Sequence, residues 1–583
     1  MSRLRKDLGQ IYYNLDKLLL LFAVIFVALD LIWPPINSWL SERLLAMTGY
    51  FYLSYTNALQ VFLNNWWVGI LLILLFLLNI GIAYAQIILI ITGMRALLKD
   101  KPQSLKQYVQ TVRHDFKAVL VRTRPSKVLF TLLYLVVLFP YLRRVFNIYF
   151  LNKFLIPQFI LDYLKNKFYL GGFFLILVVL FFYLAVRLMF ALPYILLEDI
   201  TVKEAVRISW QKTRKPWRYM GRLLTILVEA SLPLLLAAFL APWLQYLADK
   251  APEEISLTVA ILQFILLRFV QYLVLSFLMV RIVSLLLEKE MPVYERSRLH
   301  HRFRLLILFV TTIVFASQGL AFFLIPYQSL PVTISHRGVD AGNGVQNTIQ
   351  SLEKTAQLKP DYIEMDIQET KDGQFVMMHD PTLSDLAGVE LTTHDLTLAE
   401  LTQMTISENG VKTKISSFDA YLDKADQLGQ KLLIEIKTSK ADSSQLMTHF
   451  LHKYAKRIKE KGHLIHSLDY EVIAAVKKYD KTIPAYFILP YNSIFLRTLA
   501  DGYTMEHSSL TSAFMDKAWL NGKAVLAWTV NDDENMEKMI TLEAEGIITD
   551  NLTELKAVLA DRKSDKNYHD LMVRWLIENY SLI

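Results

Sequence analysis

Long apolar runs fill the first 327 residues of this 583-residue chain, and they limit its fold more than any other feature. Each run is long enough, or nearly so, for a helix to cross the roughly 30 Å hydrocarbon core of a bilayer. Because a membrane offers the backbone no water to hydrogen-bond, these runs predict an all-α polytopic bundle over residues 1–327. The seven predicted spans are 18–33, 66–91, 128–142, 170–196, 223–247, 257–287 and 305–326.

Three details of these runs affect the count of spans. The first run could be a cleaved signal peptide, but Trp33-Pro34-Pro35 follows it where a small-residue cleavage site is needed. The third run, 128–142, is short for a span, so its flanking residues must extend the helix. A further apolar stretch, 146–164, is predicted to be an interfacial or re-entrant helix, because an eighth span would largely cancel the charge asymmetry of the loops.

Lysines and arginines in the connecting segments predict the orientation of the bundle. With the amino terminus in the cytoplasm, 25 of these residues lie in inside segments and 7 in outside loops. An odd number of spans then places everything after residue 326 outside the cell, as expected for a multi-pass cell-membrane protein. Because the cations flank apolar spans, the net charge of +8 indicates contact with membrane lipids and no nucleic-acid partner.

Two features of the helical half allow more than one interpretation. A helix that begins at the Thr201-x-x-Glu204 capping box could lie on lipid headgroups or contact a partner, or it could be a connector packed against the bundle. Asp30 could line a polar cavity or reach the outer interface beside Trp33. Apart from Asp30 and Arg187, few ionisable residues lie within the spans, which argues against a transport pathway.

From Pro331 onward, short strand-like runs alternate with helical patterns. This alternation predicts an α/β domain, a (β/α)8 TIM barrel over residues 331–560, followed by a C-terminal helical tail at 561–583. The chain is thus expected to be multi-domain, with a membrane bundle before the barrel. A ninth strand, 375–379, should follow the Lys371-Asp372-Gly373 turn and fold back toward the second strand. The eight barrel strands are predicted at 332–336, 361–367, 431–437, 463–467, 483–488, 502–507, 524–530 and 546–549.

Carboxylates gather at the ends of these strands, which is the catalytic rim of a (β/α)8 barrel. Glu364 and Asp366 are two residues apart on one strand and so share a face, while Glu435 ends a neighbouring strand. Three converging carboxylates would repel one another without a cation, and all-oxygen ligation predicts one divalent ion, Ca²⁺ or Mg²⁺. The chain has no cysteine, so thiolate ligands and cysteine nucleophiles are excluded.

Basic and imidazole side chains lie beside these carboxylates. His336 and His379 are the predicted acid/base catalysts, because both stand at strand ends and imidazole titrates near neutral pH. Arg337 and Lys437 would hold a phosphate and oppose the charge that builds on its oxygens. Lone histidines elsewhere, such as His466, are expected to be structural.

Five motifs in this order resemble the glycerophosphodiester phosphodiesterase family, over roughly residues 331–560. The first half of the chain is also similar to the membrane domain fused to some of these enzymes. The motifs are His336-Arg337-Gly338, Glu364-x-Asp366, His379-Asp380, Leu433-Ile434-Glu435-Ile436-Lys437 and Gly546-Ile547-Ile548-Thr549-Asp550.

The resemblance implies a metal-dependent phosphoric diester hydrolase that releases glycerol 3-phosphate and an alcohol. The cation would bind a non-bridging phosphate oxygen and the glycerol hydroxyls, and Trp528 would pack on the glycerol. One histidine would deprotonate either a glycerol hydroxyl or water, and the other would protonate the leaving alcohol. Such relatives often carry an insertion, which corresponds here to residues 381–401.

The chain departs from the family pattern at two places. Relatives carry Pro-Glu-Asn-Thr where this chain reads Val345-Gln346-Asn347-Thr348, so a carboxylate near the site has become a neutral amide. The Arg-Thr pair expected after His379-Asp380 is also absent. The first change bears on the charge near the site and on cation affinity, and both changes indicate either altered specificity or a weakened enzyme.

The expectation is therefore a membrane-anchored hydrolase whose barrel faces outward, close to the bilayer, and cleaves glycerophosphodiesters. Lipid-derived diesters or glycerol-phosphate polymers of a cell envelope would be within its reach. The alternative is that the helical bundle carries the function, as a transporter or scaffold, and that the barrel is a sensing or binding module. The leaving alcohol, the preferred cation and the oligomeric state stay open.

Overall fold

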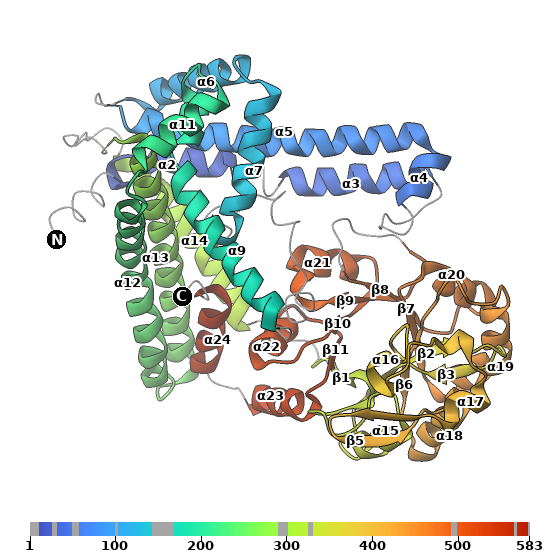
Figure 1. The fold of residues 1–583 in the computed structure, drawn as a ribbon. Helices are drawn as coiled ribbons and strands as arrows, with labels where there is room; N and C mark the ends of the chain where they lie inside the picture. Colours follow the sequence, from blue (N-terminus) through green and yellow to red (C-terminus); the bar gives the residue numbers. More distant parts are fainter. Residues whose placement is uncertain are drawn as a thin grey trace. The chain divides into compact units, whose positions relative to one another are not determined.

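The chain folds into two compact units, one helical and one built around a β-barrel (Figure 1). The helical unit comprises Met1–Leu155, Tyr163–Pro326 and Asn567–Ile583, and the barrel unit comprises Ile156–Asp162 and Tyr327–Lys566. The computed structural model describes residues 11–25, 32–48, 58–99, 103–142, 168–289, 301–324, 330–490, 498–564 and 568–580.

Among the residues that the structure describes, five helices of the helical unit are long and apolar enough to cross a membrane: α5, α9, α12, α13 and α14. The predicted span 128–142 corresponds to α7, in which the residues with described side chains, Pro125–Leu138, form a shorter apolar helix. The predicted span 18–33 lies partly outside the described residues, and the predicted stretch 146–164 lies wholly outside them. The helices are α2 (Leu15–Phe22), α3 (Trp33–Ala46), α4 (Ala58–Asn64), α5 (Trp66–Leu97), α6 (Leu105–Val121), α7 (Pro125–Leu142), α9 (Phe168–Leu188), α10 (Ala191–Leu197), α11 (Val202–Lys212), α12 (Pro216–Ala248), α13 (Glu253–Leu287), α14 (His301–Leu324) and α24 (Tyr568–Tyr580).

The predicted span 170–196 is not one helix, because the chain breaks between α9 and α10. Pro193 has no backbone N–H with which to bond the carbonyl of Met189, so a continuous helix would lose a hydrogen bond there. The backbone N–H of Phe190, in the break, donates instead to the Ser209 hydroxyl at 3.2 Å. The break therefore ends the long helix at Leu188 and fixes it to α11.

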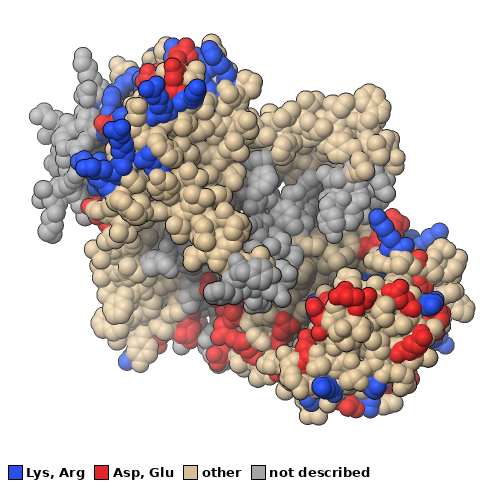
Figure 2. All heavy atoms as spheres, in the orientation of Figure 1, with Lys and Arg blue, Asp and Glu red and all other residues tan. Residues whose placement is uncertain are grey.

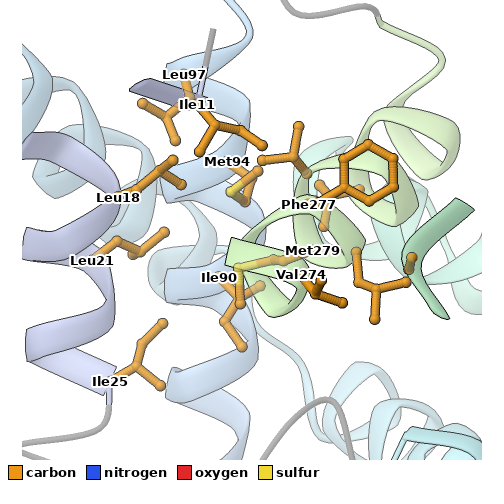
Figure 3. Close-up of a cluster of buried hydrophobic side chains, with 14 of the residues drawn as sticks. Ile11, Leu18, Leu21, Ile25, Ile90, Met94, Leu97, Val274, Phe277 and Met279 are labelled. Carbon is orange, nitrogen blue, oxygen red and sulfur yellow. The ribbon is translucent and has the colours of Figure 1, made fainter. Parts of the chain in front are cut away.

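The core of the helical unit is formed by aliphatic side chains of α2, α5 and α13. Figure 3 shows Leu18 and Leu21 of α2 facing Ile90 and Met94 of α5, with α13 beyond them. Gly93 lets α2 approach α5 closely, since a Cβ there would lie 2.7 Å from Leu21 Cδ1. All four of these apolar side chains are buried, as expected for helices that pack within a bundle.

Helix α11 packs against the bundle, which supports the connector interpretation. Its Ala205 and Ser209 are fully buried. Trp210 stacks over the buried Arg187 guanidinium, whose carbon lies 4.1 Å from the ring centroid. Lysines and arginines gather on the surface over α6 and α11, at one end of the helical unit (Figure 2). One end of the helical unit therefore carries a dense group of cations, as the loop charges predict.

The spans hold more ionisable groups than the sequence analysis recognised. Glu229 of α12 and Arg281 of α13 form an ion pair at 3.1 Å, and Arg268 lies 5.1 Å from the ring centroid of Trp575. Because each charge meets a partner from another helix, these groups hold helices together. Their presence alone does not favour the transporter alternative.

Helix α24, near the carboxyl terminus, follows the barrel in sequence but belongs to the helical unit. Its first turn is held by Asp249, which accepts from the backbone N–H of His569 at 2.8 Å. Further along, the Trp575 ring lies 4.8 Å from that of Phe264 in α13. The helix thus follows α13 from the α12–α13 turn into its apolar middle.

Replacing Trp575 by alanine is expected to destabilise the helical unit by about 3 kcal/mol, because a buried ring leaves a cavity that the neighbours fill only in part. Trp243 of α12, which is 56% exposed, provides a matched control when replaced by alanine. The thermal midpoint in detergent should fall for Trp575→Ala and stay near wild type for Trp243→Ala. Equal midpoints for the two variants would contradict the packing role of α24.

The barrel unit is a closed ring of eight parallel strands, in the order β1-β11-β10-β9-β8-β7-β6-β2 and back to β1. All eight strands lie where the sequence predicts them. They are β1 (Val332–Ser335), β2 (Tyr362–Glu369), β6 (Leu432–Ile436), β7 (Leu464–Ser467), β8 (Ala485–Leu489), β9 (Gly502–Glu506), β10 (Ala524–Trp528) and β11 (Gly546–Thr549).

Helices surround the ring, and the described part of the barrel unit contains three further short strands. β3 (Phe375–Met377) pairs antiparallel with the end of β2, as predicted. A hairpin of β4 (Thr405–Glu408) and β5 (Val411–Lys414) follows the insertion expected at 381–401 and was not predicted. The helices are α15 (Ile349–Ala356), α16 (Ser384–Ala387), α17 (Leu398–Gln403), α18 (Phe418–Leu428), α19 (Leu446–Lys461), α20 (Tyr470–Tyr479), α21 (Ser512–Leu520), α22 (Asp533–Thr541) and α23 (Leu552–Ser564).

Candidate active site

The alternation of side chains along each strand places the candidate site above the barrel core. Ile334, Leu433, Leu464, Leu526 and Ile548 form the apolar interior of the barrel. Side chains two residues further along a strand point to the same face, one layer nearer the carboxyl ends. That second layer holds His336, Glu435, His466, Trp528 and Asp550.

Glu364, Glu435 and His466 form a group whose ligand atoms all lie within 4.8 Å of one another. His466 Nε2 lies 3.5 Å from Glu364 Oε1, and all three residues are buried. Neither ring nitrogen of His466 has a hydrogen-bond partner among the described residues. Burying an imidazole and two carboxylates in this state is costly, so the group fits a divalent cation.

The sequence predicts a structural role for His466. The signal that could have assigned it to the site is the register between neighbouring strands. Glu435 pairs with His466 across β6 and β7, just as Asp366 pairs with Glu435 across β2 and β6. Once the strand order is known, a histidine in the same layer as two acidic residues is therefore expected to lie beside them. The donor set is one nitrogen and two carboxylates, where the sequence analysis expected oxygens alone.

Asp366 lies beside this group but is held by cations and an amide. Lys437 Nζ lies 3.1 Å from its Oδ1, Arg337 Nε lies 3.9 Å from its Oδ2, and Asn347 donates to Oδ2 at 2.8 Å. Burial alone would raise the pKa of Asp366, but the charges of Lys437, His379 and Arg337 and the Asn347 hydrogen bond together outweigh it, so the pKa lies well below its usual range. Asp366 as a metal ligand stays a prediction.

Lys437 joins the acidic residues of two strands. Its ammonium lies 2.8 Å from Glu435 as well as 3.1 Å from Asp366. Burial would lower the pKa of Lys437, but the Asp366 and Glu435 charges raise it above the usual range. Burial raises the pKa of Glu435. Together these groups make a charged rim whose cations are fixed in place before any anion arrives.

His336 is oriented by Asp550, a pairing that the sequence analysis did not assign. Its Nδ1 lies 2.7 Å from Asp550 Oδ1, because β11 closes the barrel against β1. Burial would lower the pKa of His336, but the Asp550 charge and hydrogen bond, together with the Glu364 charge, raise it above the ordinary value. Burial would raise the pKa of Asp550, but the His336 charge and hydrogen bond lower it to about 2.

Replacing Asp550 by asparagine should move the His336 limb of the pH profile to lower pH. The imidazolium loses its carboxylate partner, so its pKa falls, by about one pH unit. The measurement is kcat/KM as a function of pH, with Asp516→Asn, an exposed position on α21, as the control. A limb that does not move in Asp550→Asn would show that this pair does not set the titration of His336.

His379 follows β3 and reaches the same rim. Its Nδ1 lies 2.7 Å from Asp380 Oδ1, and its charge is among those that lower the pKa of Asp366. Gln368 holds the loop by donating to the carbonyls of His379 and Asp380 at 3.1 and 2.8 Å. Trp528, at the end of β10, donates from Nε1 to the Thr504 carbonyl at 3.1 Å, which fixes the ring at the rim.

A closed (β/α)8 barrel with carboxylates and imidazoles at its rim fits an enzyme, and the long apolar helices fit a membrane protein. Residues 4–322 match the membrane domain of glycerophosphoryl diester phosphodiesterase, and residues 336–554 match the glycerophosphoryl diester phosphodiesterase family. The chain therefore belongs to the glycerophosphoryl diester phosphodiesterase family, and its barrel is the enzymatic domain.

Individual relatives match the barrel half. A glycerophosphodiester phosphodiesterase of Caldanaerobacter subterraneus is 27% identical, over 38% of this chain and 93% of the relative. Human lysophospholipase D GDPD1 is 23% identical, over 39% of this chain and 85% of the relative. An Oleispira antarctica phosphodiesterase, solved with its product sn-glycerol-3-phosphate, is 21% identical, covers 40% of this chain and 97% of its own, and has a TM-score of 0.35.

Proposed function

We propose that the barrel hydrolyses glycerophosphodiesters to glycerol 3-phosphate and an alcohol with the help of one divalent cation, Ca²⁺ or Mg²⁺. The observation that carries this proposal is the buried group of Glu364, Glu435 and His466. Two carboxylates face an imidazole whose nitrogens have no hydrogen-bond partner among the described residues. A cation would satisfy all three, and Asp366, held by Lys437 nearby, is a further proposed ligand.

The remaining residues of the rim have roles that follow from their charges. Arg337 and Lys437 hold the phosphate and stabilise the charge that develops on its oxygens. His336, whose protonated form is favoured by Asp550, donates a proton to the leaving alcohol. His379 accepts a proton from the nucleophile, either a glycerol hydroxyl or water. The cation, when bound, neutralises a non-bridging phosphate oxygen and polarises the phosphorus. The Trp528 ring packs on the glycerol.

The proposed topology places the amino terminus in the cytoplasm and the barrel outside the cell. Its support is the loop charge and the gathering of cations over α6 and α11 (Figure 2). We propose lipid-derived diesters as substrates, with glycerol-phosphate polymers as the alternative. One relative is named a lysophospholipase D, which favours the lipid-derived class. The proposed division of the chain is a membrane domain over 1–327 and a barrel over 331–560.

The test is product analysis with the full chain purified in detergent. Glycerophosphocholine, glycerophosphoglycerol and lysophosphatidylcholine are incubated with the enzyme, with and without EDTA, and phosphate-containing products are separated by mass. We expect glycerol 3-phosphate from the first two, 1-acylglycerol 3-phosphate from the third, and no product with EDTA. Full activity in EDTA, or phosphocholine as the product, would contradict the proposal.

A further inference from the structure

The amide of Gln346 stands between a cation and a carboxylate at the edge of the site. Its Oε1 accepts from Arg337 Nη1 at 2.7 Å, and its Nε2 donates to Glu408 Oε1 at 2.7 Å. The backbone N–H of Gln346 donates to the other carboxylate oxygen, Glu408 Oε2, at 2.9 Å. Arg337 is thus connected to a negative charge through one neutral side chain.

The hydrogen bonds determine which way the amide faces. Two donors of residue 346, the backbone N–H and the side-chain NH₂, converge on one carboxylate, which can only accept. The amide oxygen must therefore point toward Arg337, which can only donate. Without the carboxylate the amide could rotate and present its NH₂ group to the guanidinium.

We propose that Glu408 is a positioning residue that holds Arg337 in place for the substrate phosphate, acting through Gln346. It supplies, from a different part of the chain, the negative charge that residue 346 itself lacks. The inference rests on the proposed role of Arg337 as a phosphate ligand. Arg337 suits that role, because its guanidinium lies at the barrel rim beside Asp366 and its Nε has no hydrogen-bond partner among the described residues.

The hairpin of β4 and β5 brings Glu408 to this position. Ile406 and Glu408 are two apart on β4 and so point to the same face. Ile406 is buried against Val345, the residue before Gln346, in a shared apolar cluster. Asn409 and Gly410 have positive φ angles of 51° and 77°, which make the tight two-residue turn after Glu408.

Glu408→Gln tests the proposal while keeping the size of the side chain. A glutamine has one acceptor oxygen for two donors, so the Gln346 amide loses its fixed orientation and Arg337 its acceptor. Because Glu408 is half-buried, the effect should be moderate: KM and the inhibition constant of glycerol 3-phosphate rise together by roughly fivefold, with a smaller change in kcat. Glu390→Gln, at an exposed glutamate of the predicted insertion, should match wild type.

The decisive comparison repeats Glu408→Gln in a Gln346→Glu background. There residue 346 offers Arg337 a carboxylate directly, while Glu408 adds like-charge repulsion, so Glu408→Gln should now lower KM. A substitution that is harmful in one background and beneficial in the other cannot be explained by a merely structural role. An unchanged KM in Glu408→Gln, or a rise in both backgrounds, would overturn the inference.

Arg337→Ala separates this inference from the function on which it rests. We expect KM and the inhibition constant of glycerol 3-phosphate to rise by more than in Glu408→Gln, because the phosphate ligand itself is lost. If Arg337→Ala binds glycerol 3-phosphate normally, the proposed role of Arg337 is wrong and the inference falls with it. If Arg337→Ala weakens binding and Glu408→Gln does not, only the inference fails.

Discussion

Replacing His336 or His379 by alanine is expected to lower kcat by about 10³-fold, because each removes a proton donor or acceptor from the reaction. The fold should stay intact, since both side chains lie at the rim and not in the apolar interior of the barrel. The measurement is kcat with glycerophosphocholine, together with the thermal midpoint. His452→Ala, an exposed histidine on α19, is the control and should behave as wild type.

A change of leaving group then distinguishes the two histidines. With a glycerophosphodiester of p-nitrophenol the departing oxygen needs no proton, so a missing general acid matters little. We expect His336→Ala to recover most of its activity with this substrate and His379→Ala to stay inactive. If only His379→Ala recovered activity with this substrate, His379 would be the general acid and His336 the general base. Near-normal kcat in both variants with glycerophosphocholine would refute both roles.

The second large effect concerns the cation. Replacing Glu364 or Glu435 by glutamine removes a charged ligand, and we expect affinity for the divalent ion to fall at least about 100-fold, with loss of activity at micromolar cation. Calorimetric titration with Mn²⁺ measures the affinity directly, and Glu471→Gln, exposed on α20, is the control. Unchanged Mn²⁺ affinity in both variants would contradict the assigned site.

His466→Ala gives a sharper test of the ligand group. As a ligand, His466 contributes to cation affinity, and its loss should weaken Mn²⁺ binding about tenfold. As a structural histidine, its loss would lower the thermal midpoint and leave Mn²⁺ affinity unchanged. The ring nitrogens of His466 have no hydrogen-bond partner among the described residues, and Nε2 lies 3.5 Å from Glu364, which favours the first result.

The barrel could be predicted from sequence because its strands are short apolar runs separated by helices, and each strand lies within a few residues of its expected position. The side chains that the sequence analysis assigned to the site also lie on the rim, since alternation along a strand places residues two apart on one face. The β4–β5 hairpin was missed because its strands, Thr-Ile-Ser-Glu and Val-Lys-Thr-Lys, are four residues long and mostly polar.

The roles of His466, Asp550 and Glu408 depend on contacts that no local pattern contains. His466 becomes a neighbour of Glu435 through the order of the strands, and Asp550 meets His336 only because the ring closes, 214 residues away along the chain. Glu408 contacts Gln346 across 62 residues through the β4–β5 hairpin, which follows the insertion. In the helical unit, the break at Met189 follows from Pro193, a signal that was present in the sequence.

The most direct test of the account is a structure of the full chain with Mn²⁺ and glycerol 3-phosphate bound. We expect one anomalous scattering peak at the barrel rim, with oxygens of Glu364 and Glu435 and a ring nitrogen of His466 about 2.2 Å from it. The phosphate should lie against Arg337 and Lys437, between the two imidazoles. A peak away from these carboxylates, or a bound phosphate with no metal at the rim, would contradict the account.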